Sequence, residues 1–355
     1  MTSHSEWGFE TTASEVADTF AEGIRGRTIL ITGVSLGGLG GTTAKALAAH
    51  APRLLILTGR FRDKVDAVIH EIRHDHPRIN CRFLQIDLSS QSSVRKAAAE
   101  LLNYDDVDGI DLLINNAGVM DVQERTLSSE GIELQFATSH IGHFLLTNLI
   151  MPKLISAAAQ TPRNQHSANV RIINVSSSAH VFSPIRFSDH TFSKPVEAIP
   201  EDEWPDFDRF RAINGMPDDS SPYIPFAGYG ESKTANVLFS LSLTSRLASR
   251  YNITSFALHP GSIPTELQRN SDQEKLAESR RRFRLTKRRN LEQGSSTTLV
   301  AALDPGLLAG NIDEGSGLYL DDCQIGKQAD WAKDPRAAER LWQLSEKLVG
   351  QTFDS

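Results

Sequence analysis

Tyr229 and Lys233 stand four residues apart in the stretch YGESK, and on a helix this spacing puts both side chains on one face. The ordinary pKa of a phenol, about 10, makes proton exchange near neutral pH difficult. A neighbouring ammonium favours the phenolate and lowers that pKa. The pair could therefore act as a general acid toward a carbonyl oxygen or as a base toward a hydroxyl. Taken alone, this spacing is more often an ordinary surface pair.

Polar residues also follow two apolar runs that we predict to be buried strands. Ser176, Ser177 and Ser178 follow one run, and the stretch NNAG at residues 115–118 ends another. At the carboxyl end of a parallel strand, hydroxyls would project into the crevice where such sheets bind ligands, and a glycine would allow close backbone approach. The alternative interpretation of each stretch is an ordinary polar turn.

A glycine-rich stretch, ITGVSLGGLGGTTAKAL at residues 31–47, has the build of a phosphate cradle. The usual pattern is TGxxxGxG, whereas here four residues separate Gly33 from Gly38. If Gly38 and Gly40 align with the last two glycines of the pattern, the extra residue lengthens only the turn. The helix would still offer its free N–H groups to a pyrophosphate. We therefore predict a working variant, with the backbone of Leu36 touching the cofactor.

Short runs rich in Ile, Leu and Val alternate with stretches of helical spacing. This alternation predicts an α/β fold in which about seven parallel strands, buried on both faces, carry helices on either side. The predicted strands are 27–32, 53–58, 81–86, 111–115, 170–176, 253–258 and 316–320, and the predicted helices are 40–50, 62–74, 90–102, 127–156 and 229–250. Residues 179–227 have no clear period and predict a long irregular insertion before Tyr229.

Composition limits the possible functions. The formal charge of −7 over 355 residues argues against general nucleic-acid binding and favours a small-molecule partner. With only two cysteines, neither a disulfide framework nor a metal site is predicted. No basic start with an apolar run behind it and no bilayer-length apolar stretch is present, so we expect a cytoplasmic protein without a membrane span. The sequence leaves homo-oligomerisation open.

Six stretches in one order resemble the short-chain dehydrogenase/reductase family: the glycine loop, IDLSS, NNAG, the serine strand, YGESK and HPGSIPTEL. The stretches GHFLLTNLIMPKL and YGESKTANVLFS are similar to its retinol-dehydrogenase-like and WW-domain-oxidoreductase-like branch. The resemblance implies a single Rossmann-type, doubly wound domain over about 24–325. An N-terminal extension at 1–23 would precede it, and a helical tail at 326–355 would follow.

The resemblance also implies roles for single residues. Tyr229 would donate the proton, Lys233 would lower its pKa and bond the nicotinamide ribose, and Ser177 would hold the substrate oxygen, with Ser178 as the alternative. The other implied cofactor contacts are Gly33, Leu36, Gly38 and Gly40 in the glycine loop, Asp87 and Leu88 at the adenine, Asn116, Ala117 and Gly118 at the adenosine ribose, and Pro260, Gly261, Ile263 and Thr265 at the nicotinamide carboxamide and pyrophosphate.

The end of the second predicted strand bears on the choice of cofactor. NAD-binding members usually place a carboxylate there to bond the ribose 2′-hydroxyl. Here Gly59 stands near that place, Arg60 is next and Lys64 is one turn on. Cations favour a 2′-phosphate because Arg can bond it in a charge-assisted, bidentate way. We therefore predict NADP(H); the alternative is a solvated Arg and Lys at a helix start.

Two features depart from the family pattern. In FATSHIGHF, Ser139 stands where the family has an asparagine that helps to hold a water in a proton relay. The relay is therefore open to question. Hydride transfer itself does not depend on the relay. The insertion between Ser177 and Tyr229, about fifty residues long, also prevents the substrate pocket from being inferred by analogy.

A basic run, RRRFRLTKRR at 280–289, lies at the end of the lid region that the resemblance implies at about 264–290. A solvated lid helix is the favoured interpretation, and recognition of an anionic substrate or partner is the main alternative. A nuclear-import or nucleic-acid patch is a further alternative, which the negative net charge disfavours. For the whole chain we predict NADPH-dependent reduction of a ketone or aldehyde of a lipophilic, polyketide-like or isoprenoid-like metabolite in secondary metabolism, or the reverse oxidation. The alternatives are a dinucleotide-binding regulatory or scaffold protein without turnover and a non-redox dehydratase or cyclase.

Overall fold

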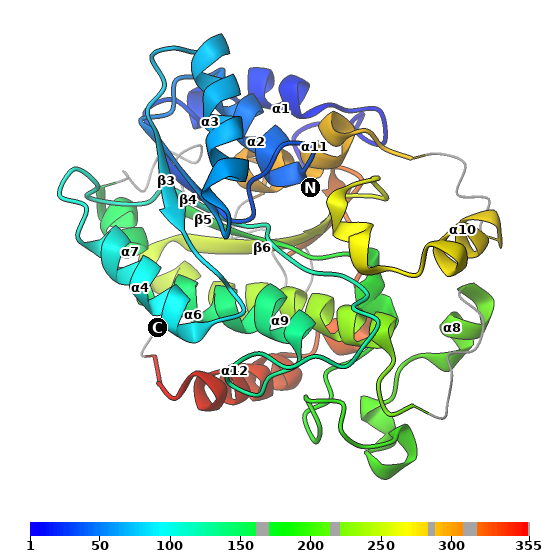
Figure 1. The fold of residues 1–355 in the computed structure, drawn as a ribbon. Helices are drawn as coiled ribbons and strands as arrows, with labels where there is room; N and C mark the ends of the chain where they lie inside the picture. Colours follow the sequence, from blue (N-terminus) through cyan, green and yellow to red (C-terminus); the bar gives the residue numbers. More distant parts are fainter. Residues whose placement is uncertain (161–169, 214–220, 283–287, 308–317, 354–355) are drawn as a thin grey trace.

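The computed structural model describes residues 1–160, 170–213, 221–282, 288–307 and 318–353, which form one sheet covered by helices on both faces (Figure 1). The sheet has the order β3-β2-β1-β4-β5-β6-β7-β8, parallel except for β8. The strands are β1 Thr28–Ile31, β2 Leu54–Gly59, β3 Cys81–Gln85, β4 Leu112–Asn115, β5 Val170–Val175, β6 Ile253–His259, β7 Tyr319–Asp321 and β8 Gln324–Ile325. The predicted doubly wound sheet is confirmed.

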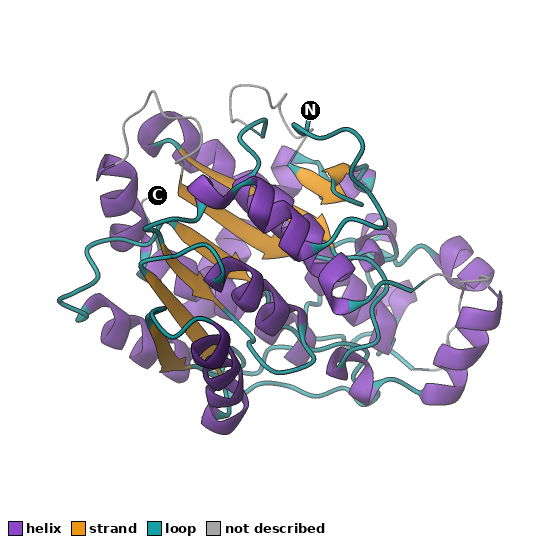
Figure 2. Ribbon diagram, turned by 90° about the horizontal axis from the view of Figure 1, so that it is seen from above, coloured by secondary structure: helices purple, strands orange, loops and turns teal. Residues whose placement is uncertain are grey.

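Helices cover the central strands on both sides of the sheet (Figure 1). Every residue of β1, β4 and β5 is buried, which explains why their sequences read as continuous apolar runs. One layer contains α1 Ala13–Thr19, α2 Leu39–Ala48, α3 Arg62–Asp75 and α11 Leu291–Leu303; the other contains α4 Gln91–Leu102, α6 Gly142–Leu149, α7 Met151–Gln160, α9 Pro225–Tyr251 and α12 Pro335–Val349 (Figure 1). Figure 2 shows the twist of the sheet between these layers.

The prediction of one helix over 127–156 is wrong in its first part, which is not helical, and the rest of the helix is interrupted. Gly131 has φ +77, and Leu127 pairs with Glu133 in an isolated antiparallel bridge, so the chain turns before the helix can begin. The buried carboxylate of Glu133 then accepts the Phe136 N–H at 2.8 Å and caps the first turn. The helical segments are α5 Leu134–Phe136, the π-helix η2 Ala137–Ile141, α6 and α7.

The insertion is ordered around a buried ion pair where the structure describes it. Arg186 Nη2 lies 2.6 Å from Asp189 Oδ2, and both side chains are almost completely buried. The carboxylate also accepts the backbone N–H groups of Ser193 and Lys194, which offset its desolvation. The chain then forms α8 Phe207–Ile213 and enters α9 at Pro225; residues 214–220 lie outside the described part.

The N-terminal segment packs against the sheet domain. The side chain of Ser3 donates to Asp304, and the Gln324 amide donates to the carbonyl of Trp7 at 2.8 Å. Trp7 is buried and its ring lies edge-on to Phe20 at 5.5 Å. In the described ranges no single helix has the length and apolarity to cross a membrane; the bent pair Leu134–Leu149 and Met151–Gln160 passes that test only by length and composition.

Candidate active site

A cavity of about 980 Å³ opens beyond the carboxyl ends of β1, β4, β5 and β6. This is where parallel α/β sheets bind ligands. Most residues predicted for the site line it: Ser177, Tyr229, Lys233, Gly33, Gly38, Arg60, Lys64, Asp87, Leu88, Asn116, Ala117, Gly118, Pro260, Gly261, Ile263 and Thr265. Leu36, Gly40 and Ser139 do not line it.

Tyr229 and Ser177 meet at this cavity. Helix α9 carries Tyr229 and Lys233 on one face, as their spacing predicts, and Ser177 follows β5. Burial raises the pKa of Tyr229 to about 12, and the nearby Ser177 hydroxyl acts in the opposite direction. The Ser177 oxygen accepts the Ala179 N–H at 3.1 Å, which leaves its own hydrogen for an acceptor at the cavity. At neutral pH the phenol is therefore protonated.

Lys233 lies beside the phenol ring. Its Nζ is 5.5 Å from the centroid of the Tyr229 ring and donates to the Val175 carbonyl at 3.0 Å. Burial lowers the pKa of Lys233 to about 8. The ammonium thus has one backbone partner and two further donor hydrogens that can reach other groups at the cavity.

His180 holds the backbone of Ser177. Its Nε2 accepts the Ala329 N–H at 3.2 Å, so its proton is on Nδ1, which donates to the Ser177 carbonyl at 2.7 Å. Burial lowers the pKa of His180 to about 4, and the ring stays neutral near pH 7. Sequence reasoning missed this contact; the only available signal was the histidine in NVSSSAH.

The glycine loop and the NNAG turn are joined by Thr32. Its hydroxyl accepts the N–H groups of Asn116 and Ala117 at 2.9 and 3.0 Å and donates to His143 Nε2 at 2.8 Å. The opposite nitrogen of His143 therefore carries the proton and donates to the Ser139 carbonyl at 3.0 Å. This buried chain fixes two walls of the cavity relative to each other.

The glycine loop makes a tight turn at the cavity, although two of its predicted contact residues, Leu36 and Gly40, do not line it. Gly33 has φ +72, and a Cβ there would lie 2.7 Å from the Ala117 Cα, so both its conformation and its packing require glycine. Gly40 does not line the cavity, and a Cβ there would lie 2.7 Å from Asn116 Nδ2. Leu36 is 42% exposed. Helix α2 begins after Gly38 without a side-chain cap, which leaves its first N–H groups for a ligand.

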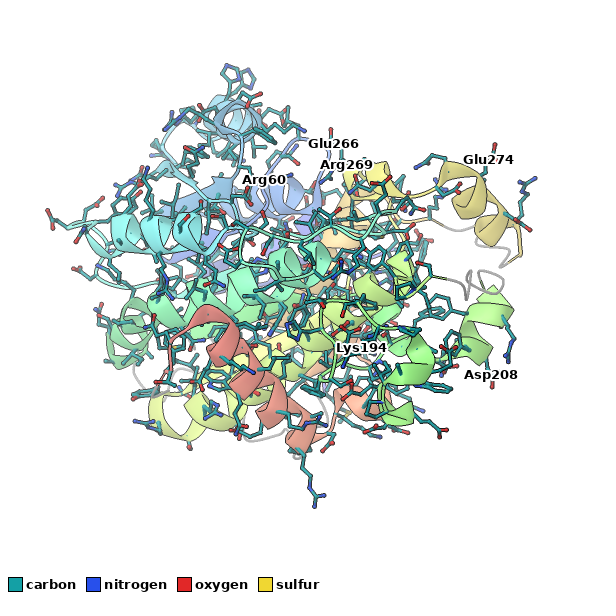
Figure 3. All side chains as sticks on the ribbon, turned by 60° about the horizontal axis from the view of Figure 1, so that its bottom comes forward. Arg60, Lys194, Asp208, Glu266, Arg269 and Glu274 are labelled. Carbon is teal, nitrogen blue, oxygen red and sulfur yellow. The ribbon has the colours of Figure 1, made fainter. Side chains whose placement is uncertain are left out.

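Cationic side chains occupy the rim of the cavity beyond β2. Arg60 is exposed, and Lys64 lies 2.9 Å from Glu266 of the lid region. Figure 3 shows Arg60 on the same side of the molecule as Glu266 and Arg269, and all three line the cavity. No carboxylate stands at the end of β2, where the chain reads Thr-Gly-Arg-Phe. This rim can hold a phosphate group.

The basic run divides between two environments where the structure describes it. Helix α10, Gln273–Arg282, contains its first residues, while 283–287 lie outside the described part. Arg289 is only 4% exposed, donates to the Pro260 carbonyl at 3.3 Å and pairs with Asp322. Its guanidinium also lies 5.1 Å from the centroid of the Phe9 ring. The solvated interpretation therefore does not hold for Arg289, which supports the loop after β6.

Comparison with known proteins identifies the family. A sequence model described as short chain dehydrogenase matches residues 27–195. The chain is 38% identical to oxidoreductase fscI of Fusarium equiseti over 71% of this chain and 93% of that protein. It is 35% identical to short-chain dehydrogenase TIC 32 A, chloroplastic, of Brassica napus over 97% of this chain and 95% of that one. This chain is a short-chain dehydrogenase/reductase.

The branch is confirmed as well. This dehydrogenase is 34% identical to human retinol dehydrogenase 13 over 92% of this chain and 86% of that protein. Among solved structures, it resembles an uncharacterised protein from Mycobacterium Paratuberculosis with a TM-score of 0.64 and 28% identity, covering 93% and 96% of the two chains. Membership makes the chain an oxidoreductase of a family that binds a nicotinamide dinucleotide.

Ser139 lies near Lys233 but outside the lining of the cavity. It is part of the π-helix η2, and its buried hydroxyl has no hydrogen-bond partner in the described structure. A Cβ on Gly118 would lie 3.4 Å from both Ser139 Oγ and Lys233 Nζ, so Gly118 stands beside both groups. Ser139 therefore lies near the lysine without lining the cavity.

Ser139→Ala is expected to lower turnover by much less than the roughly hundredfold loss that marks removal of an acid–base group. The hydroxyl is unpartnered, so its loss should leave the thermal midpoint unchanged or slightly higher. Ser139→Asn should leave NADPH affinity nearly unchanged and should not abolish turnover. Steady-state kinetics and NADPH titration check both variants. A loss in Ser139→Ala as severe as that of Tyr229→Phe would make the serine a full member of the proton path.

Proposed function

We propose that this dehydrogenase is an NADPH-dependent reductase of ketones or aldehydes of lipophilic compounds, and that it catalyses the reverse oxidation of the alcohols. The observation that carries the proposal is the meeting of Ser177, Tyr229 and Lys233 at one cavity, with the phenol protonated at neutral pH. These groups suit a carbonyl oxygen that must be held and then protonated.

The residues divide the chemistry of reduction among them. When bound, a nicotinamide dinucleotide would supply the hydride for the carbonyl carbon. Ser177 and Tyr229 donate hydrogen bonds to the carbonyl oxygen, and Tyr229 gives up its proton as that oxygen becomes a hydroxyl. The Lys233 ammonium, near the phenol ring, favours the phenolate that remains. Because burial keeps Tyr229 protonated at neutral pH, the site starts in the form that reduction needs.

Local features support a dinucleotide with a 2′-phosphate. The uncapped start of α2 leaves N–H donors for a pyrophosphate, and Gly33 lets the glycine loop pack closely against Ala117. At the other end of the cofactor region, Arg60 is available at the rim and no carboxylate follows β2. A carboxylate there would bond a ribose hydroxyl and repel a phosphate, whereas Arg60 favours the phosphate.

The cavity wall supports a lipophilic substrate. Phe182, Phe210, Ile224 and Phe226 line it near Tyr229. Similar proteins include retinol dehydrogenases, whose name specifies a lipophilic alcohol. A role in secondary metabolism stays a prediction, as does a cytoplasmic location, since one relative is named chloroplastic.

The direct test follows the absorbance of reduced nicotinamide while the protein is mixed with NADPH and a panel of lipophilic ketones and aldehydes. We expect substrate-dependent oxidation of NADPH, and slower oxidation of NADH. Tyr229→Phe serves as the inactive control. Tight NADPH binding without oxidation of the cofactor by any compound would favour the scaffold alternative. Conversion of a substrate without cofactor oxidation would favour a dehydratase or cyclase.

The pH profile gives a separate prediction. Burial lowers the pKa of Lys233 to about 8, so the ammonium that favours the phenolate is present below that pH and is lost above it. For reduction, kcat/KM for NADPH should therefore fall as the pH rises through about 8, because this parameter reports the free enzyme. Initial rates between neutral and alkaline pH check this. A profile that stays flat through this range would contradict it.

A further inference from the structure

Three phenylalanine rings form a continuous wall beside the catalytic tyrosine. Phe182 follows the turn after Ser177, Phe210 belongs to α8, and Phe226 is the second residue of α9. The Phe182 centroid lies 5.3 Å from those of Phe210 and Phe226, and the latter two are 6.2 Å apart. All three line the cavity. The insertion thus supplies an aromatic surface, which we call the phenylalanine wall.

The wall adjoins the place where the carbonyl would react. The Phe226 ring centroid lies 5.9 Å from that of Tyr229, with 47° between the two planes. Phe226 is half-buried, while Phe182 and Phe210 are buried and meet it almost perpendicularly, at 82° and 89°. These two rings fix the orientation of Phe226, so a ligand meets a surface that is already ordered before binding.

The polar groups next to the wall form hydrogen bonds with other parts of the protein. The Tyr223 hydroxyl donates to the Val122 carbonyl at 2.9 Å and accepts from the Gln135 amide at 3.0 Å. Asp121 also lines the cavity. Burial and Glu133 raise the pKa of Tyr223, and Asp121 adds to this effect, so the Asp121 carboxylate is close to the phenol. An anionic substrate would be repelled here, whereas an uncharged ring would lose no hydrogen bond.

We propose that the phenylalanine wall selects flat, uncharged ketones and aldehydes that carry an aromatic ring, in preference to saturated compounds of the same size. The inference rests on the proposed reductase function. Apolar burial alone favours both kinds of compound, because it depends on area rather than on aromaticity. Edge-to-face contact with rings already held in place adds a preference for an aromatic partner.

The test compares two bicyclic ketones, β-tetralone and β-decalone, which share a carbon skeleton and in neither of which a ring is conjugated to the carbonyl. In the wild type the ratio of their kcat/KM values should favour β-tetralone. In Phe226→Leu that ratio should fall roughly two- to tenfold, with β-decalone much less affected, because leucine keeps an apolar surface without the ring.

Phe207→Leu is the matched control. Phe207 is half-buried and packs against the same cluster, one turn before Phe210 on α8, but does not line the cavity. Its replacement should leave the ratio unchanged, and thermal unfolding should show that both variants are folded. An unchanged ratio in Phe226→Leu, or an equal fall in both variants, would overturn the inference.

A binding measurement separates this inference from the function on which it rests. Both ketones are titrated calorimetrically into the protein saturated with NADP⁺. If neither ketone is reduced, the reductase proposal fails. Tighter binding of β-tetralone than of β-decalone, lost in Phe226→Leu, would still support selection by the phenylalanine wall. Equal affinities for the two ketones in the wild type would overturn the wall whether or not turnover occurs.

Discussion

Tyr229→Phe is expected to lower turnover by about 10²–10⁴-fold while NADPH affinity stays near that of the wild type. The substitution removes the only buried phenol that contacts Ser177 in the described structure and keeps the ring that packs against Phe226. Lys233 retains its bond to the Val175 carbonyl, so the cofactor side of the site is undisturbed. Steady-state reduction rates and an NADPH titration measure the two effects separately.

Tyr223→Phe provides the control for this experiment. Tyr223 also lines the cavity, but its hydroxyl is bonded to the Gln135 amide and the Val122 carbonyl rather than to Ser177. Its removal should lower the thermal midpoint, because the Gln135 amide loses a buried partner, and should affect turnover far less. Near wild-type turnover in Tyr229→Phe would remove that residue from the mechanism.

The sheet and the placement of Tyr229 and Lys233 could be predicted because their signals are local. Strands such as Leu112–Asn115 are apolar throughout since helices cover both faces, and a spacing of four residues is enough to put Tyr229 and Lys233 on one side of α9. Helix α9 begins at Pro225, before the predicted start at Tyr229, and its first turn lies within the stretch that has no clear period. Local signals thus predict the centre of each helix or strand more accurately than its ends.

The remaining features depend on contacts between distant parts of the chain. His180 is fixed by Ala329, 149 positions away, and no spacing in the sequence links the two. The phenylalanine wall unites three residues that share no period. A π-helix over Ala137–Ile141 differs from an α-helix by one residue in its hydrogen bonding, which an apolar pattern does not reveal. Leu36 is exposed and does not line the cavity, so the predicted contact of its backbone with the cofactor stays a prediction.

Arg60→Ala is expected to weaken NADPH binding by roughly 10- to 100-fold, the effect of losing one hydrogen bond to a charged group, and to change NADH binding little. Only NADPH has a 2′-phosphate that Arg60 could bond. Within the described part of the chain Arg60 forms no ion pair, so its guanidinium is available, whereas Lys64 is paired with Glu266. Titration of the two reduced cofactors gives the affinities directly.

Neighbouring variants decide how the Arg60 result is understood. Arg62 stacks on the Phe83 ring with 4.4 Å between its guanidinium carbon and the centroid, and it does not line the cavity. Arg62→Ala should therefore leave both affinities unchanged, which excludes a general loss of positive charge as the cause. Glu266→Gln should strengthen NADPH binding, because it releases Lys64 and removes a carboxylate from the phosphate rim. Equal losses for NADPH and NADH in Arg60→Ala would contradict the assignment of the 2′-phosphate to Arg60, whatever the other two variants show.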